Sequence, residues 1–456
     1  MLMRIIVFLL LLFFPVAARN VELYGASFET DVHLAVQNSN TRPAAEQPQS
    51  AEVINEPNDV LTLRQALTLA LLHNPELKVF SLEMRAAQAR ELQAGLWPNP
   101  ELEVEIENVG GTGDLNGFNG AETTIWLGQL IELGDKSQKR KKVASLQKEL
   151  ADWDYEKKRL EIFSEATKAF IAVLETQQKL QLSGDLLNLS RESFNAVQKR
   201  VDAGKDSPLE KTRAGVAVSN IEIQFQKAQR DLEFARKRLT SFWVQEIPRF
   251  QKAVGQLEEL EPPLSQQHLI ELLRRNPEYA RWETELKKNK AVLELEKSKS
   301  LPDITFAAGL RRFNATDDNA FVFGVGIPLP VSDRNQGTRQ EAIINLSKAG
   351  EEQKAVWLKL QNEFNQKYQE FINAYSLATS LKNQVLPAAT ELFNAARRAY
   401  QEGKSDYLNV LDVQRTFFEL KNEYIQSLAA YHSAGTDIER LIAQQITLLS
   451  NTSGKE

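Results

Sequence analysis

The sequence predicts a mainly α-helical fold with a small β part, in which one unit of helix, helix, strand, strand, long helix and return helix occurs twice. Two short helical segments, Leu61–Pro75 and Leu264–Pro277, both end in Asn-Pro and lie about 200 residues apart, a spacing too long for a solenoid repeat. Each precedes two alternating segments and then a very long run with helical periodicity. We therefore expect a first repeat over residues 59–247, a linker over 248–263 and a second repeat over 264–445.

The N-terminus has the features of a secretory signal peptide. Arg4 precedes the apolar run Ile5–Phe14, and a proline and small residues ending at Ala18 follow it. This order predicts export and cleavage after Ala18. A transmembrane anchor is the alternative, but the run falls short of the roughly 20 apolar residues that a spanning helix needs. We expect an extended N-terminal arm over 19–58 and a short C-terminal tail over 446–456.

The helices are predicted from apolar periodicity and from stop signals. Each Asn-Pro step begins a second helix, Glu76–Gly95 in the first repeat and Glu278–Ser300 in the second, and each of these stops at a proline step. The long helices follow later, Ser137–Ala203 and Thr338–Glu402, the second with a bend expected at Pro387.

A glycine turns each long helix into a return helix, expected over Leu209–Trp243 and Tyr407–Ala443. Helices of this length with narrow apolar stripes need partner helices, so they predict a coiled-coil-like assembly.

Two strands per repeat are predicted from strict alternation of apolar residues with other residues. In Glu101–Asn108 the apolar residues share one parity and four glutamates the other, and a glycine-rich loop leads to Thr123–Ile131. Residues 303–310 and 321–329 alternate in the same way in the second repeat. Four strands are too few for an independent barrel, because the smallest outer-membrane barrels have about eight.

Composition excludes several functions. Lys and Arg total 55 against 61 Asp and Glu, and this net charge of −6 gives no support for nucleic-acid binding. The absence of cysteine excludes a disulfide framework, a thiolate metal site and a lipid-carrying cysteine. The four histidines are scattered singly and no catalytic motif occurs, so we expect no enzyme, no metal site and no cofactor.

An exported chain with polar helices and short alternating strands has two explanations. Strand edges cannot lie open in lipid. The first explanation is therefore an oligomer that crosses an outer membrane as a shared barrel, with a helical tube in the periplasm. The alternative is a soluble periplasmic coiled-coil structural protein with an ordinary small sheet. The duplicated strand pairs and the export signal favour the oligomer.

Four motifs indicate which kind of outer-membrane oligomer this chain resembles. They are I-P-L-P-V-S-D-R-N-Q-G at Ile327–Gly337, I-E-L-G-D-K-S-Q-K-R at Ile131–Arg140, A-Y-Q-E-G-K-S-D-Y-L-N-V-L-D-V-Q-R at Ala399–Arg415 and the weaker G-K-D-S-P-L-E at Gly204–Glu210. Together, over roughly residues 60–445, they resemble the TolC-type outer-membrane efflux family, in particular its cobalt–zinc–cadmium (CzcC-like) branch.

That resemblance implies a homotrimer with a twelve-stranded outer-membrane β-barrel, continued by a periplasmic α-helical barrel. It implies the channel of a tripartite efflux system, a passive exit duct for heavy-metal cations. The implied partners are a periplasmic adaptor (membrane fusion) protein, a proton-driven RND-type inner-membrane pump and outer-membrane lipid. The same channel could instead serve drug efflux or type I protein secretion.

The resemblance also implies a periplasmic gate and adaptor-docking turns. Asp412 matches a family aspartate, whereas Asn409 stands where another is usual; Tyr400 and Glu210 match a closing hydrogen-bonded pair, and Ser405 replaces an arginine of that closure. The expected docking residues are Gly204, Ser207, Leu209, Gly403, Ser405, Leu408 and Leu411. The alternative for the docking residues is tight-turn chemistry, in which the glycines supply a positive φ, and coiled-coil packing. The alternative for the gate residues is a helix surface contact.

The parity of the first strand supports an inference that is independent of the family. If Leu102, Val104 and Ile106 face lipid, the residues of the other parity face the pore, and these are Glu101, Glu103, Glu105 and Glu107. Rings of acidic groups favour cations. The alternative is that some of these glutamates lie beyond the membrane, solvated and inert.

Overall fold

The computed structural model describes residues 56–445, and these contain both repeats in the predicted order. The predicted signal peptide, most of the arm and the tail lie outside the described residues. The first repeat contains β1 (Val60–Thr62), α4 (Leu63–His73), α5 (Pro75–Ala94), β2 (Glu101–Glu107), the 3-10 turn η1 (Gly113–Leu115), β3 (Glu122–Ile131), α6 (Lys136–Asp202), α7 (Pro208–Thr240) and the 3-10 turn η2 (Ser241–Trp243). After β4 (Lys252–Val254), the second contains α8 (Gln266–Leu272), the 3-10 turn η3 (Leu273–Arg275), α9 (Pro277–Ser298), β5 (Ile304–Phe313), β6 (Asp318–Gly326), α10 (Gln336–Ser380), the π-helical turn η4 (Leu381–Val385), α11 (Leu386–Gln401) and α12 (Tyr407–Ile442).

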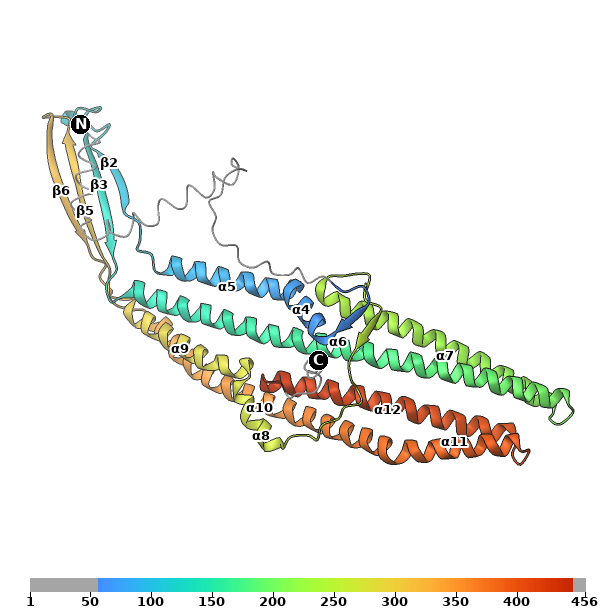
Figure 1. The fold of residues 1–456 in the computed structure, drawn as a ribbon. Helices are drawn as coiled ribbons and strands as arrows, with labels where there is room; N and C mark the ends of the chain where they lie inside the picture. The colour runs from blue at the N-terminus through green and yellow to red at the C-terminus, as the bar shows by residue number, and fades with distance from the viewer. Residues whose placement is uncertain (1–55, 446–456) are drawn as a thin grey trace, which may run out of the picture. The chain divides into compact units, whose positions relative to one another are not determined.

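Helix α6 joins the two repeats. It contacts α5 and α7 of its own repeat and α9 and α12 of the other (Figure 1). Near the strands the helices contact one another in the order α5, α6, α9, α10, and toward the turns in the order α7, α6, α12, α11. The repeats therefore form one layer of neighbouring helices rather than two separate bundles.

Asn74 and Asn276 explain why each repeat begins with two helices joined at a corner. The Asn74 side chain accepts hydrogen bonds from the first N–H groups of α5 and donates to the Phe242 carbonyl at 3.1 Å, just after α7. Asn276 likewise caps α9 and donates to the Leu441 carbonyl at 2.8 Å, at the end of α12. N-terminal N–H groups and C-terminal carbonyls of helices lack partners within the helix. Each asparagine therefore supplies a hydrogen-bond acceptor to the N–H groups at the beginning of one helix and a donor to a carbonyl at the end of another helical segment.

The long helix of the second repeat is interrupted where a bend was predicted. Pro387 has no N–H group, and its ring excludes the carbonyl four residues earlier. The helical turn before the proline contains one additional residue, because the Leu386 N–H donates to the Leu381 carbonyl, five residues earlier, and so forms a π-helical turn. The predicted interruption is confirmed, although it begins before the proline.

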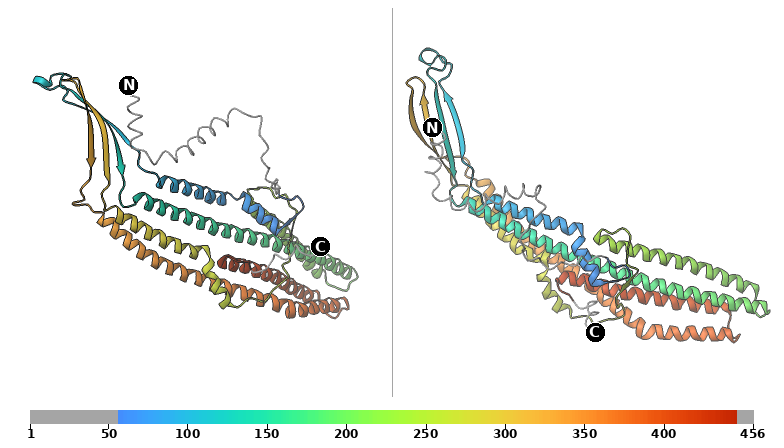
Figure 2. Two further views of the ribbon diagram at one scale, coloured as in Figure 1. Left: turned by 60° about the vertical axis from the view of Figure 1, so that its left-hand side comes forward. Right: turned by 45° about the horizontal axis from the view of Figure 1, so that its top comes forward.

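The four long strands form one antiparallel sheet in the order β2-β3-β5-β6, which continues from the helical part (Figure 2). Its register sets Leu102 opposite Leu127, Leu127 opposite Ala308 and Ala308 opposite Phe323. Opposite residues share a face of a sheet, so the apolar parities of all four strands coincide. Within residues 56–445, the outer edges of β2 and β6 have no partner strand.

The strand predicted over residues 321–329 is too long at its C-terminal end. Strand β6 ends at Gly326, so Ile327 and Leu329 follow it in an irregular segment. Two prolines, Pro328 and Pro330, alternate with them, and proline cannot donate a hydrogen bond to a neighbouring strand.

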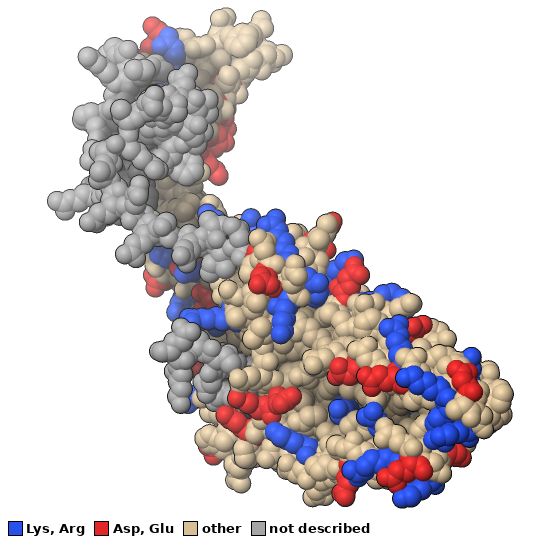
Figure 3. Space-filling model, turned by 45° about the vertical axis from the view of Figure 1, so that its right-hand side comes forward, with Lys and Arg blue, Asp and Glu red and all other residues tan. Residues whose placement is uncertain are grey.

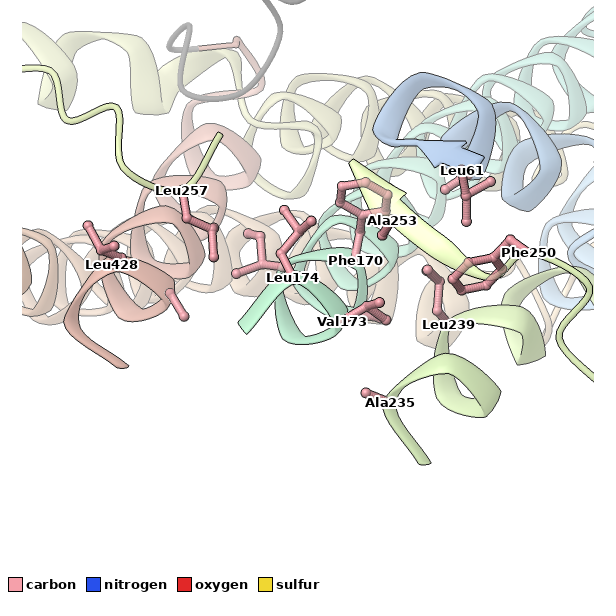
Figure 4. Packing of buried hydrophobic residues seen from close by; sticks show 14 of the residues in the cluster. Leu61, Phe170, Val173, Leu174, Ala235, Leu239, Phe250, Ala253, Leu257 and Leu428 are labelled. Atoms are coloured by element: carbon pink, nitrogen blue, oxygen red, sulfur yellow. The ribbon is translucent and has the colours of Figure 1, made fainter. Parts of the chain in front are cut away.

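The segment predicted as a linker over residues 248–263 is part of the core. Its strand β4 pairs in parallel with β1, and Leu61 lies opposite Ala253. The Gln177 side chain donates to the Ala253 carbonyl at 2.9 Å and accepts from its N–H at 2.8 Å. Figure 4 shows Phe250 and Leu257 packed in the same buried cluster as residues of α6, α7 and α12. Strands of three residues are too short for a detectable period, so they escaped prediction.

The arm predicted over residues 19–58 also ends too late. Glu56 is 8% exposed, and its carboxylate accepts hydrogen bonds from the Trp243 indole at 3.1 Å and from the backbone N–H of Phe250 at 3.1 Å. The ordered first repeat therefore includes Glu56, whose carboxylate binds the segment that follows α7.

We expect Asn276→Asp to destabilise the protein although it keeps the helix cap. Aspartate still accepts from the N–H groups of α9, but it cannot donate to the Leu441 carbonyl and places a negative charge beside it. A buried carbonyl that loses its partner costs about 1–3 kcal/mol. Thermal unfolding followed by circular dichroism should show a lower midpoint. Asn373→Asp, at an exposed position of α10, is the matched control, and equal midpoints for the two variants would contradict this role of Asn276.

Candidate functional site

The two helical hairpins end in the same turn. Gly204 and Gly403 have φ angles of 67° and 74°, which confirms the positive φ predicted for both. In each turn the glycine N–H donates to the carbonyl three residues earlier at 2.9 Å, and the next lysine N–H donates to the carbonyl five residues earlier at 2.8 Å. This pair of bonds is the Schellman motif. An added Cβ would meet no atom within 4 Å at either glycine, so backbone conformation alone requires glycine here.

Beyond the glycines the two turns differ in which residue caps the return helix. Ser207 caps α7, and its hydroxyl accepts from the Leu209 N–H at 3.2 Å. Asp406 caps α12, and its carboxylate accepts from the Asn409 N–H at 3.0 Å. Ser405 then accepts from the Asn409 side chain at 3.0 Å. Asn409 therefore belongs to the local structure of the second turn.

Equivalent leucines stand out from both turns. Leu209 is 55% exposed and Leu408 is 52% exposed, and each is the second residue of its return helix. Leu411 instead packs against the buried cluster that joins the hairpins. The predicted docking residues thus divide into exposed positions and positions that shape or pack the turn.

The hairpins are joined by a three-residue cluster, Arg200, Asp206 and Tyr400, which we call the tip clasp. The Arg200 guanidinium holds the Asp206 carboxylate in two hydrogen bonds of 2.8 and 3.0 Å. The Tyr400 hydroxyl, from the other repeat, donates to the same carboxylate at 2.8 Å, and the guanidinium lies over the Tyr400 ring. The tip clasp links the end of α6, the first turn and the end of α11.

The charges of the tip clasp stabilise one another. The Arg200 hydrogen bonds and the Tyr400 hydroxyl hold the pKa of the Asp206 carboxyl below its ordinary value. Burial and the Asp206 carboxylate raise the pKa of the Tyr400 hydroxyl. Asp206 therefore stays ionised and Tyr400 stays protonated at neutral pH, which is the state that forms the hydrogen bonds.

The prediction that Tyr400 pairs with Glu210 is wrong. Glu210 lies in the first turn of α7 and pairs with Arg213 at 2.9 Å within the same helix. Its other carboxylate oxygen is buried without a hydrogen bond, and its charge, after burial, helps to raise the pKa of Tyr407 to about 12. Asp206 precedes the helix, so its side chain reaches back across the turn to Arg200. The two turns differ in sequence, with Asp206-Ser207 in the first and Ser405-Asp406 in the second, and this difference could have indicated which acid pairs with Tyr400.

Asp412 lies apart from the tip clasp. It pairs with Arg415 in its own helix at 2.8 Å, and its side chain is 66% exposed. With Leu408 and Leu411 it lines a groove of about 540 Å³ formed by α6, α7 and α12. The structure thus brings Tyr400 together with Asp206, and it leaves Asp412 and Glu210 in separate local pairs.

The sheet has two faces of opposite chemistry. The apolar face carries large hydrophobic side chains that remain exposed, and these include Leu102, Val104, Ile106, Phe321, Phe323 and Val325. The opposite face, which we call the glutamate face, carries the four predicted glutamates of β2 together with Glu122, Thr124, Trp126 and Arg311. The predicted segregation of Glu101, Glu103, Glu105 and Glu107 from the apolar residues is confirmed as a matter of side-chain parity.

The helical surface is polar and mixed in charge. Figure 3 shows Lys and Arg interspersed with Asp and Glu over the helices. None of the helices within residues 56–445 has an apolar stretch long enough to cross a membrane. Across the same stretch of chain, no three His, Cys, Asp or Glu side chains gather where they could hold a metal ion.

Two solved structures share this fold. The outer membrane channel CmeC of Campylobacter jejuni superposes with a TM-score of 0.69 at 14% identity, covering 89% of this chain and 94% of that one. CusC superposes with a TM-score of 0.64 at 19% identity, covering 90% and 100%. At these identities the likeness establishes the fold alone.

Sequence relatives establish the family. The chain is 32% identical over 384 residues to the cobalt-zinc-cadmium resistance protein CzcC of Cupriavidus metallidurans, covering 84% of this chain and 90% of that protein. It is 23% identical over 300 residues to the nickel-cobalt-cadmium resistance protein NccC of Alcaligenes xylosoxydans xylosoxydans, covering 66% and 67%. Residues 66–243 and 269–444 match the profile of the outer membrane efflux protein family. The chain therefore belongs to the outer membrane efflux protein family, which confirms the predicted channel class and the predicted outer-membrane location.

Proposed function

We propose that this protein is a homotrimeric exit duct for heavy-metal cations, the outer-membrane part of a tripartite efflux system. The observation that carries the proposal is the two-faced sheet. Its exposed apolar face suits lipid, and its glutamate face then lines a pore that attracts cations. The resistance proteins CzcC and NccC, to which the chain is similar, support metal cations as the cargo.

The edges of the protomer support closure with further copies. Strand β2 and helix α5 form one edge of the layer, and strand β6 and helix α10 form the other. Both edge helices expose large apolar residues: Val79, Leu82 and Leu92 on α5, and Ile343, Ile344 and Leu358 on α10. A head-to-tail contact between unlike edges closes into a ring when the rotation permits it. Three copies would supply twelve strands, which satisfies every strand edge in the membrane.

The turns of the hairpins are the proposed docking surface for a periplasmic adaptor. Leu209 and Leu408 repeat the same exposed apolar side chain at the ends of both hairpins. Gly204, Ser207, Gly403 and Ser405 shape these ends, and Leu411 packs against the buried cluster that joins the hairpins. An inner-membrane, proton-driven RND-type pump would supply the energy.

The periplasmic gate is assigned to the tip clasp and to Asp412. The tip clasp ties the two hairpins of one protomer together, so breaking it weakens their link to what the buried cluster around Tyr407 supplies. Asp412, exposed on α12, adds a carboxylate beside the groove. Glu210 is left out of this assignment, because it pairs with Arg213 in its own helix.

Deletion of the gene from its host should sensitise growth to zinc, cadmium and cobalt, and a plasmid copy should restore resistance. Growth with detergents should not change. The pyoverdine export outer membrane protein OpmQ of Pseudomonas putida is also similar, at 22% identity over 389 residues, so export of an organic molecule is the competing outcome. Sensitivity to detergents or loss of a secreted product, with unchanged metal resistance, would exclude metal cations as the main cargo.

The double variant Tyr400→Phe with Asp206→Asn should raise ion conductance in a planar bilayer, because it removes the hydrogen bond from the Tyr400 hydroxyl to the Asp206 carboxylate and leaves only the longer bond of 3.4 Å from Arg200 to the Tyr400 carbonyl within the tip clasp. Glu210→Gln is the matched control, since its partner lies in its own helix. The pKa of Asp206 is lowered, so the contribution of the tip clasp is present above the ordinary aspartate pKa and is lost as the pH falls through the lowered value. Wild-type conductance should rise in that acidic range. A double variant that conducts like the wild type would contradict the assignment.

Replacing Glu101, Glu103 and Glu105 together by Gln should reduce the preference for cations over anions, measured as a reversal potential across a salt gradient. The same three positions changed to Asp keep the charge and should keep the preference. If the Gln variant retains the wild-type reversal potential, these carboxylates lie outside the conducting path.

A further inference from the structure

Arg311 of β5 is the centre of an ionic cluster at the end of the sheet that is remote from the helices. Its guanidinium lies 3.0 Å from a Glu107 carboxylate oxygen and 3.1 Å from a Glu122 carboxylate oxygen. It also donates to the Thr124 hydroxyl at 2.8 Å. The cluster spans β2, β3 and β5, and all of its members lie on the glutamate face.

The register explains why a cation is needed at this place. Glu107 and Glu122 are directly opposite each other in the antiparallel pair β2–β3. Like charges directly opposite on one face of a sheet repel each other. Arg311 contacts both carboxylates, and Asn108 donates to the second oxygen of Glu122 at 3.2 Å. The guanidinium thus reduces the charge of this cluster from −2 to −1 in each protomer.

Without the guanidinium, the same atoms resemble a site for a divalent cation. Two opposed carboxylates, a hydroxyl and a side-chain amide are the oxygen ligands that divalent cations bind in proteins. A duct must release its cargo, because conduction requires binding weak enough for the ion to leave. A ring of such sites at the exit would retain the ions that the duct is proposed to export.

We propose that Arg311 is a built-in counter-ion that sets ion specificity at the outer mouth of the duct by closing the Glu107–Glu122 pair to metal ions. The inference rests on the proposed function for its pore and its metal cargo. It divides the glutamate face into two parts. Glu101, Glu103 and Glu105 remain free to attract cations, whereas the pair at the mouth is occupied by the protein's own cation.

The test is Arg311→Gln in the purified trimer, with K⁺ currents recorded in a planar bilayer as Zn²⁺ is added. The Zn²⁺ concentration that halves the current should fall about tenfold or more below that of the wild type, the range by which neighbouring groups change metal affinity. EDTA should reverse the block. The cation-over-anion permeability ratio in Zn²⁺-free buffer should rise as well.

Arg312→Gln is the matched control. It removes the same charge one residue away, but Arg312 has the opposite parity and pairs with Asp317 in the β5–β6 turn. It should leave the Zn²⁺ response unchanged. The triple variant Arg311→Gln, Glu107→Gln, Glu122→Gln removes the carboxylates and should lose the response again. Arg311→Lys keeps the charge and should behave like the wild type.

Heat stability of the trimer gives a second measurement that does not depend on conduction. Repulsion between Glu107 and Glu122 should lower the dissociation temperature of Arg311→Gln, and Zn²⁺ should restore it; if the variant does not assemble, Zn²⁺ should restore refolding. No Zn²⁺ effect on current, dissociation temperature or refolding would overturn the proposal. A cell that exports no metal would leave these results intact, so failure of the proposed cargo is distinguishable from failure of this inference.

Discussion

The register of one four-stranded sheet is the constraint on which the membrane part depends. Side chains alternate between faces along a strand, and a slip of one residue in any pair would move that strand's apolar set to the other face. The observed pairs place Leu102, Leu127, Ala308 and Phe323 on a common line. The sheet therefore has one apolar face, which carries this line, and one face that carries the carboxylates. Within residues 56–445 both edges of the sheet are unpaired, and the proposed ring of three copies would pair them.

The helical part depends on a different device, used once in each repeat. The Asn-Pro step sets a corner between two helices, and the asparagine amide also reaches the last carbonyls of the return helix. One short polar side chain thereby connects the beginning and the end of each repeat, across 168 residues of sequence in the first and 165 in the second. The return helices α7 and α12 run from the turns back to these corners, so carbonyls at their C-terminal ends find hydrogen-bond partners there.

Element order was predictable from sequence because each long element carries its own period, 3.6 for the helices and 2 for the strands. The three-residue strands β1 and β4 carry no period, and their pairing depends on Phe250 and Leu257 reaching a core built by distant helices. The tip clasp was missed for a related reason. Tyr400 and Asp206 are 194 residues apart, and which acid faces the tyrosine depends on how two hairpins dock. Arg311 lies one residue beyond the strand predicted over 303–310, although β5 extends to Phe313, and its partners depend on register.

The two turns show how a small sequence difference between repeats creates an asymmetric link. Both turns have glycine followed by lysine, and then the first has Asp206-Ser207 where the second has Ser405-Asp406. Because Ser207 caps α7, the Asp206 carboxylate is left for Arg200 and Tyr400. Because Asp406 caps α12, only a serine hydroxyl is left in the second turn, and it cannot hold a guanidinium as a carboxylate does. Exchanging two neighbouring residues thus places the carboxylate that links the hairpins in the first turn rather than the second, and the Tyr400 hydroxyl of the other repeat is its partner.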